Sequence, residues 1–284
     1  MKTIFVSTDF SSTGNNAVKY AVQYALSTSS NLVVFHAVHM PKFSPTITEV
    51  GFQNLERKTE EIHHKKLQDL VDKIYLNLGL KRAGKKTKVI VKNGIFVMDT
   101  LLKAAKSHEA DLIIVGTHGA TGLKIFGSTT SELIFNSNTP VLAIPPRCRY
   151  KKMESMVYAT DLKNVVSELR SIAPIAKKVK ALIEVLYLDF GMIPNRPIIE
   201  PKDLMKHVQY KKIKVIVQKE KQGLSILAQI QRYLKNRRPE VLIMFPEERS
   251  LFDKLFVRSK TEELLYHTKL PLLTLRKSRV TNSN

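Results

Sequence analysis

The chain has 284 residues, with 46 Lys and Arg against 25 Asp and Glu, one cysteine and 43% apolar residues. It is longer than one core usually organises and too apolar to be largely disordered, and the lone Cys148 excludes an internal disulfide or a thiolate metal cluster. No run of residues could span a bilayer and no signal segment follows Met1, so we expect a cytoplasmic protein of two domains.

Apolar runs and helical patterns alternate through the first half of the chain. Continuous Val-, Ile- and Leu-rich runs predict strands buried on both faces at residues 3–6, 31–36, 88–91 and 111–115. Between them, apolar residues at helical spacing predict helices around 17–25, 53–78 and 101–105, the second of them long and charged. This alternation is typical of a doubly wound parallel sheet with helices on both faces.

The second half repeats the first. Residues 6–10 return at 158–162 (offset 152), 31–36 at 181–186 (150), 88–91 at 214–217 (126), 111–115 at 240–244 (129) and 128–144 at 259–275 (131). The sequence therefore predicts two tandem α/β domains, each with an open, five-stranded, mainly parallel sheet. We place them at residues 1–147 and 151–284, with a linker at residues 145–149 and the boundary near residue 148. The second copy lacks 24 residues between its second and third strands.

The first domain carries a candidate anion site. In an open parallel sheet a ligand binds beyond the carboxyl ends of the strands, at the point where the winding reverses. Thr8 and Asp9 follow the first strand, and a glycine-rich loop from Gly116 to Gly127 follows the fourth and leads into a helix at Ser128. Glycines let the backbone approach a phosphate, and the free N–H groups of a helix N-terminus favour an anion. Ser128 is either a hydroxyl donor to the anion or simply the helix cap.

These residues resemble the universal stress protein family, and the tandem arrangement resembles its two-domain members, whose fold is of the adenine nucleotide alpha hydrolase type. The resemblance rests on residues 8–11, 36–38 and 115–119 and on Gly127-Ser128. In the nucleotide-binding branch of the family, glycines and a hydroxyl hold the phosphates and an Asp holds the adenosine. Carried over, this assigns the phosphates to Gly116, Gly119, Gly127 and Ser128, and the adenosine to Thr8, Asp9 and Ala37. Val115, His118 and Thr129 of the same segment are further candidate nucleotide-binding residues. The loop departs from the family pattern, with seven residues between Gly119 and Gly127 instead of nine.

The resemblance implies a stress-response regulator that binds ATP or another adenine nucleotide, with Mg²⁺, and hydrolyses it slowly if at all. The second domain keeps Thr160-Asp161 but has no glycine in residues 245–259 and places Glu247 and Glu248 near the phosphate position, so we expect it to bind no nucleotide. By resemblance to family dimers, strand 270–275 should pair with strand 141–144. The chain could also form a homodimer. The alternative function is a ligand-free module that binds a protein or an anionic polymer.

Other residues offer weaker candidates. The histidines at 36, 39, 63 and 64 lack the partners of a metal site, so we expect them to be satisfied or solvent-facing. His118 could reach a phosphate or, equally well, make a hydrogen bond within its loop. Asp9 could be a general base and could equally well cap the first helix. No serine has the neighbours of a catalytic nucleophile, so no catalytic or metal-binding residue is assigned. An ATP pyrophosphatase is the least favoured class, because its Ser-Gly-Gly loop is replaced by residues 7–12.

The net charge of +21 admits two interpretations. It could attract a polyanion, or it could be a solvated coat. The basic residues are spread along the chain without a recognisable nucleic-acid-binding motif, and the clusters at 81–86 and 177–180 fall at expected helix ends, where cations offset the helix dipole. We therefore favour the coat and do not expect nucleic acid, although the second half carries +14 of the charge and residues 1–147 only +7.

Overall fold

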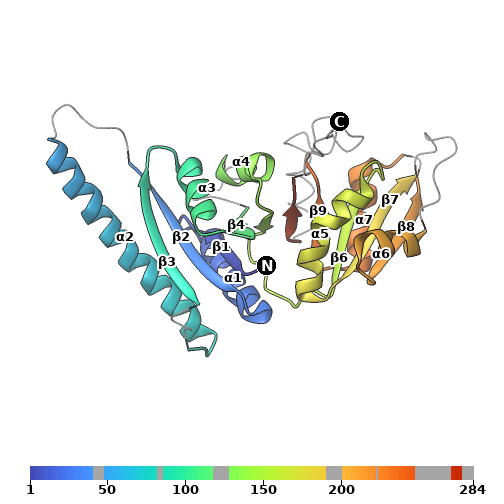
Figure 1. Cartoon of the computed structure of the whole chain (residues 1–284), viewed down its shortest axis with the longest axis horizontal. Helices are drawn as coiled ribbons and strands as arrows, with labels where there is room; N and C mark the ends of the chain where they lie inside the picture. The colour runs from blue at the N-terminus through green and yellow to red at the C-terminus, as the bar shows by residue number, and fades with distance from the viewer. Residues whose placement is uncertain are drawn as a thin grey trace. The chain divides into compact units, whose positions relative to one another are not determined.

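The structure, a computed structural model, describes residues 1–40, 48–81, 86–117, 128–189, 200–221, 223–246 and 270–276, with the side chains of Ser128 and Thr129 excepted. The chain divides into two compact units, Met1–Tyr150 and Lys151–Asn284. Each is a layered α/β unit built on a parallel sheet (Figure 1).

The first unit is a doubly wound sheet with the strand order β3-β2-β1-β4-β5, in which each strand runs parallel to its neighbours within the unit. Helices α1 and α2 contact each other on one face, and α3 and α4 contact each other on the other face (Figure 1). Its elements are β1 (Thr3–Ser7), α1 (Ser12–Thr28), β2 (Asn31–His39), α2 (Glu49–Asn77), β3 (Thr87–Gly94), α3 (Val97–Ser107), β4 (Leu112–Gly116), α4 (Ser128–Asn136) and β5 (Val141–Ile144).

The centre of this sheet is fully apolar. Ile4, Phe5 and Val6 of β1 have no exposed surface, and β2 and β4 on either side of β1 are buried in the same way. A strand that is covered by helices on both faces must be apolar at every position, not only at alternate ones. The α/β class that the apolar runs predict is confirmed.

Helix α2 packs on the sheet by its second half only. Its buried residues are Leu67, Val71, Ile74 and Tyr75, a stripe at helical spacing that contacts β2 and β3. The first half is fixed by polar contacts, because Asn93 of β3 donates its backbone N–H to Glu60 Oε1 (3.1 Å) and its Nδ2 to the Glu56 carbonyl (2.9 Å). The helix begins at Glu49, capped by Thr48, which is earlier than the sequence predicts.

The second unit has the strand order β10-β9-β6-β7-β8, again with parallel pairs. This order repeats that of the first unit, whereas the long helix α2 is replaced by the eight-residue α6. Its described elements are β6 (Ser155–Thr160), α5 (Val165–Val179), β7 (Leu182–Asp189), α6 (Pro201–Val208), β8 (Ile213–Lys219), α7 (Ile226–Arg237), β9 (Val241–Met244) and β10 (Leu272–Thr274).

Strand pairing corrects the alignment of the two halves by one residue. Thr3 pairs with Asn31 in the first unit and Ser155 with Leu182 in the second, which gives the second strands an offset of 151 instead of 150. The other offsets agree with the strand registers. A shift of one residue moves each side chain of a strand to the opposite face. It therefore decides that Tyr187, and not Leu186, stands where the first unit has His36.

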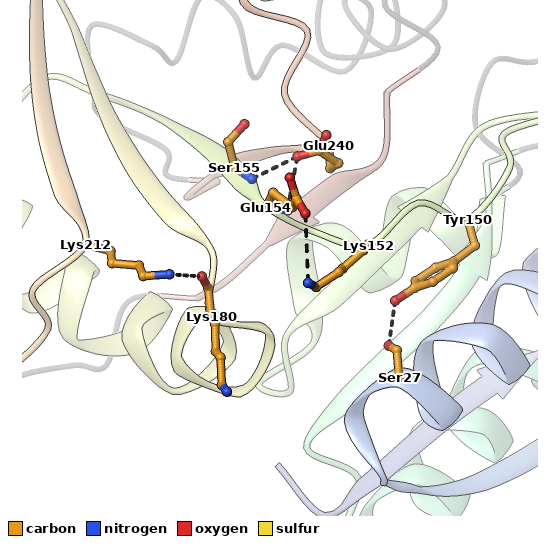
Figure 2. A network of polar contacts seen from close by, with 8 residues as sticks. All are labelled: Ser27, Tyr150, Lys152, Glu154, Ser155, Lys180, Lys212 and Glu240. Atoms are coloured by element: carbon orange, nitrogen blue, oxygen red, sulfur yellow. Dashed lines mark hydrogen bonds and ion pairs between the residues drawn. The ribbon is translucent and has the colours of Figure 1, made fainter.

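In both units a carboxylate accepts hydrogen bonds from the backbone at the start of the first strand. Asp111 Oδ2 accepts the backbone N–H groups of Lys2 (2.6 Å) and Thr3 (2.8 Å). Glu240 Oε2 accepts those of Glu154 (3.2 Å) and Ser155 (2.8 Å), as Figure 2 shows. The acidic residue therefore has the same structural role before the fourth strand of each unit.

A buried carboxylate distinguishes the second unit. Glu184 of β7 is 1% exposed at its side chain and accepts hydrogen bonds from Tyr233 Oη (2.6 Å) and Arg237 Nε (3.0 Å) of α7, with Arg237 Nη2 on its other oxygen. Burial by itself raises the pKa of Glu184, but the hydrogen bonds and charge of these partners outweigh it, so its pKa lies below the usual value. The ion pair thus contributes stability above the pKa of the unfolded chain and loses it as the pH falls through the folded-state pKa.

Arg237→Met should destabilise the second unit by roughly 3 kcal/mol at neutral pH, because it leaves a buried carboxylate without its cation. In this variant burial prevails and the pKa of Glu184 rises, so the loss should shrink as the pH is lowered toward about 4. Urea unfolding of both proteins at several pH values measures this. Lys235→Met, on the same helix and exposed, is the control and should cost little; an equal loss in the two variants would contradict the role of the ion pair.

Candidate functional site

The turn after β1 is built by the side chain of Thr8. Its Oγ1 accepts the backbone N–H of Phe10 (3.0 Å) and donates to Asn15 Oδ1 (3.1 Å), while Asn15 Nδ2 donates to the Phe10 carbonyl (3.2 Å). Phe10 has a φ of 63°, a left-handed conformation that a bulky residue adopts only when its surroundings hold it there. Because Thr8 is only 4% exposed, its hydroxyl is enclosed within the turn, where these hydrogen bonds hold the backbone in shape.

Asp9 lies exposed on this turn, directly before helix α1. Its Oδ1 accepts the backbone N–H of Ser11 (3.0 Å), and Ser11 in turn caps the helix by accepting the N–H of Gly14 (3.0 Å). The alternative prediction that Asp9 caps the helix is therefore wrong. A Cβ at Gly14 would lie 2.6 Å from Asp9 Oδ1 and 2.8 Å from Thr8 Oγ1, so only glycine lets the helix start this close to the turn.

The end of β2 lies beside this turn. His36 is 9% exposed and its Nδ1 is 2.8 Å from the carbonyl oxygen of Thr8, which can only accept, so Nδ1 carries the proton. Burial lowers the pKa of His36; the Thr8 carbonyl and Asp9 oppose this, while His63 and Lys66 add to it. The next residue, Ala37, is partly exposed and has a small side chain, which leaves space at the strand end.

Helix α2 contributes an imidazole and an ammonium group to the same place. The ring of His63 stacks on that of His36, with centroids 5.3 Å apart and planes 16° apart. The Phe10 ring packs against the His36 ring, with their centroids 4.4 Å apart, and Lys66 Nζ lies 4.2 Å from the centroid of the Phe10 ring. Neither His63 nor Lys66 is among the site residues predicted from the sequence. The sequence does indicate that His63 faces the sheet, because it stands four residues before Leu67 of the buried stripe of α2.

The end of β4 lies on the other side of β1, against the start of α1. A Cβ at Gly116 would lie 2.9 Å from the Thr13 carbonyl oxygen, so this glycine is required for close packing. Thr130 Oγ1, in the first turn of α4, donates to the Gly116 carbonyl (2.7 Å). The N-terminus of α4, whose first N–H groups have no partner within the helix, is thereby fixed beside the carboxyl end of β4.

The predicted site residues thus divide into three groups. Thr8, Asp9, Ala37 and Gly116 meet at the carboxyl ends of three neighbouring strands, β2, β1 and β4. Val115 is buried in the core, 4% exposed, and does not face a ligand with its side chain. His118, Gly119 and Gly127 lie outside the described residues, and of Ser128 and Thr129 only the place in α4 is described.

The sequence model of the universal stress protein family matches residues 1–145, half of the chain. The chain belongs to the universal stress protein family. Universal stress protein MJ0577 of Methanocaldococcus jannaschii is 29% identical over 153 residues, which are 50% of this chain and 94% of that protein. A universal stress protein from Archaeoglobus fulgidus has a similar structure, with a TM-score of 0.66 and 14% identity over 98% of this chain and 97% of its own; at this identity the likeness shows the fold alone.

In this universal stress protein the second unit repeats the turn but not its surroundings. Thr160 Oγ1 accepts the N–H of Leu162 (3.0 Å), and Leu162 has a φ of 69°. Asp161 is buried, with Lys163 Nζ 3.7 Å from its Oδ2. By strand register, Tyr187 and Leu188 stand in place of His36 and Ala37, and both are buried. Large side chains therefore fill the place that Ala37 leaves open.

In the part of the chain that the structure describes, no three His, Cys, Asp or Glu side chains gather as metal ligands. No helix in the same residues has the length and hydropathy of a membrane span.

The contact between His36 and Thr8 predicts a pH-dependent stability. Because the folded pKa of His36 lies below that of the unfolded chain, its contribution is complete above about pH 6.5 and is lost as the pH falls toward the folded pKa. His36→Asn keeps an N–H donor for the Thr8 carbonyl but does not titrate, so its stability should fall less between neutral pH and pH ~5. Urea unfolding at both pH values tests this. The control is His39→Asn, an exposed histidine whose ring also bonds a carbonyl; an equal fall in all three proteins would refute the assignment.

Proposed function

We propose that the first unit binds an adenine nucleotide, with ATP and Mg²⁺ as the first candidate, and that the protein is a cytoplasmic stress-response regulator with little or no hydrolysis. The observation that carries the proposal is the meeting of Asp9, Ala37 and the α4 N-terminus around the end of β1, the point where the winding of the sheet reverses. Open α/β sheets bind their ligands at this point.

The two sides of the site suit the two ends of a nucleotide. On the β2 side, the Asp9 carboxylate can accept hydrogen bonds from ribose hydroxyls, and Ala37 leaves room for a flat base. On the β4 side, the N–H groups at the start of α4 favour phosphate oxygens. The loop residues Gly119 and Gly127 and the hydroxyl of Ser128 would complete the phosphate side, as the family pattern implies.

A regulatory role is proposed because the described groups near the site are poorly placed for hydrolysis. His36 is buried at the end of β2, where its Nδ1 donates to the Thr8 carbonyl and its ring stacks on His63, so it lies on the adenosine side and not at the phosphate end. Asp9 lies on the adenosine side, away from the phosphate end. A slow ATPase is the most that this arrangement supports.

The second unit is proposed to be a degenerate copy of the family domain that binds no nucleotide. Buried Tyr187 and Leu188 and the Lys163 side chain beside Asp161 support this. The pairing of residues 141–144 with 270–275 and the homodimer stay predictions.

The nucleotide is tested by denaturing the protein purified from cells and separating any released ATP, ADP or AMP, followed by calorimetric titration of the emptied protein. Asp9→Ala should weaken adenine nucleotide binding at least tenfold, since it removes the acceptor for the ribose. Asp161→Ala removes the equivalent residue of the second unit and should leave the affinity unchanged.

An empty protein that takes up no adenine nucleotide would overturn the proposal and favour the ligand-free interaction module. Equal losses in the Asp9 and Asp161 variants would assign a site to both units. Thermal unfolding of each variant shows whether a loss of binding is only a loss of fold.

A further inference from the structure

Basic residues precede four neighbouring strands of the second unit. In the order of the sheet, Arg238 comes before β9, Lys151 and Lys152 before β6, the cluster 177–180 before β7, and Lys211 and Lys212 before β8. In a parallel sheet these positions lie at one edge, together with the C-termini of the helices. We call this edge, defined by Lys151, Lys152, Lys177, Lys178, Lys180, Lys206, Lys211, Lys212, Lys235 and Arg238, the basic edge; all these residues are exposed.

Few carboxylates stand against these cations. Glu240 is occupied by the backbone N–H groups of Glu154 and Ser155, and Glu154 lies 3.9 Å from Lys152 (Figure 2). Lys212 Nζ donates to the Lys180 carbonyl (2.8 Å), so this cation does stabilise a helix end. For the other residues of the basic edge, the described part of the chain shows no ion pair.

Two of these cations stand where the backbone favours glycine. Lys180 and Arg238 end helices α5 and α7 with φ angles of 60° and 52°. A left-handed residue at a helix end is usually glycine, because any Cβ is strained there. In the first unit the same position after α1 is Ser29, with a φ of 52° and no charge. The left-handed φ alone therefore does not explain the long cationic side chains, because Ser29 adopts it without a charge.

We propose that the basic edge binds the phosphodiester backbone of a nucleic acid without reading its sequence. Strands lie about 4.8 Å apart, so four strands spread the cations over a row of roughly 15 Å, and a duplex carries one negative charge per ~1.7 Å. The row contains no exposed aromatic side chain that could stack on bases, since Tyr210 is buried with its hydroxyl on the Ala181 carbonyl. An extended, regular line of negative charge fits this row better than the irregular surface of an acidic protein.

The fold changes what the net charge of the chain indicates. Read along the chain, the lysines are scattered and a solvated coat is the simpler account. The fold gathers them, because β–α units place the residues before each strand at the same edge. This edge is opposite to the carboxyl ends at which sheets of this type bind nucleotides, so the proposal does not depend on a nucleotide site.

The test uses the full chain and fluorescein-labelled oligonucleotides, as RNA and DNA, single-stranded and duplex, with anisotropy measured over a series of salt concentrations. Lys180→Gly combined with Arg238→Gly should weaken binding roughly tenfold or more and lower the slope of log K against log salt by about two. Thermal unfolding should show an equal or higher melting temperature, because glycine relieves the strained φ at both positions. Binding to any of the four oligonucleotides supports the proposal, and the oligonucleotide that binds most tightly shows which type of nucleic acid the basic edge prefers.

Two variants are matched controls. Ser29→Gly makes the same backbone change in the first unit, and Lys65→Gln with Lys73→Gln removes two exposed charges from α2; neither should change binding by more than about twofold. The proposal is overturned if no oligonucleotide binds at low salt, if the α2 double variant loses as much as the glycine double variant, or if polyglutamate of equal charge competes as well as the oligonucleotide. Competition by polyglutamate would indicate that the basic edge binds an acidic protein instead.

Discussion

A single side chain, the threonine hydroxyl at the end of the first strand, sets the geometry on which both units depend. In each unit it accepts an N–H two residues later and holds a bulky residue, Phe10 or Leu162, at positive φ. The chain can then leave the sheet and enter a helix within a few residues. In the first unit this entry is close enough that Gly14 and Gly116 have no room for a Cβ. The position of Asp9 and the packing of β4 on α1 both follow from this turn.

Around this shared turn the two units have become different. The first keeps a small residue, Ala37, and a long helix whose His63 ring covers His36. The second replaces the helix by eight residues, fills the strand end with Tyr187, and introduces a buried ion pair at Glu184. A repeated fold therefore supports one candidate ligand site, one filled counterpart, and one charged edge that the first unit does not carry to the same extent.

Much of this could be predicted from the sequence, since parallel strands covered on both faces must be apolar throughout and a repeat is visible without a structure. The parts that could not be predicted depend on register and on contacts across the chain. Periodicity alone could not tell an offset of 150 from 151, because both align apolar residues, yet only strand pairing brings Tyr187 opposite His36. The role of His63 could not be predicted, because it depends on how α2 packs against the sheet. The basic edge could not be predicted because it depends on the strand order, which places residues that are far apart in the chain before neighbouring strands.

The uneven anchoring of α2 has a consequence for motion. Its second half buries Leu67, Val71 and Ile74, whereas its first half is held by Asn93 and by the stacked rings at His63. Local opening has a free energy set by the contacts that it breaks, so the first half can unwind at a small fraction of the cost of global unfolding. Each such event uncovers His36 and the turn at Phe10 while the sheet stays intact. Such unwinding would stop near Leu67, where the buried stripe of α2 begins.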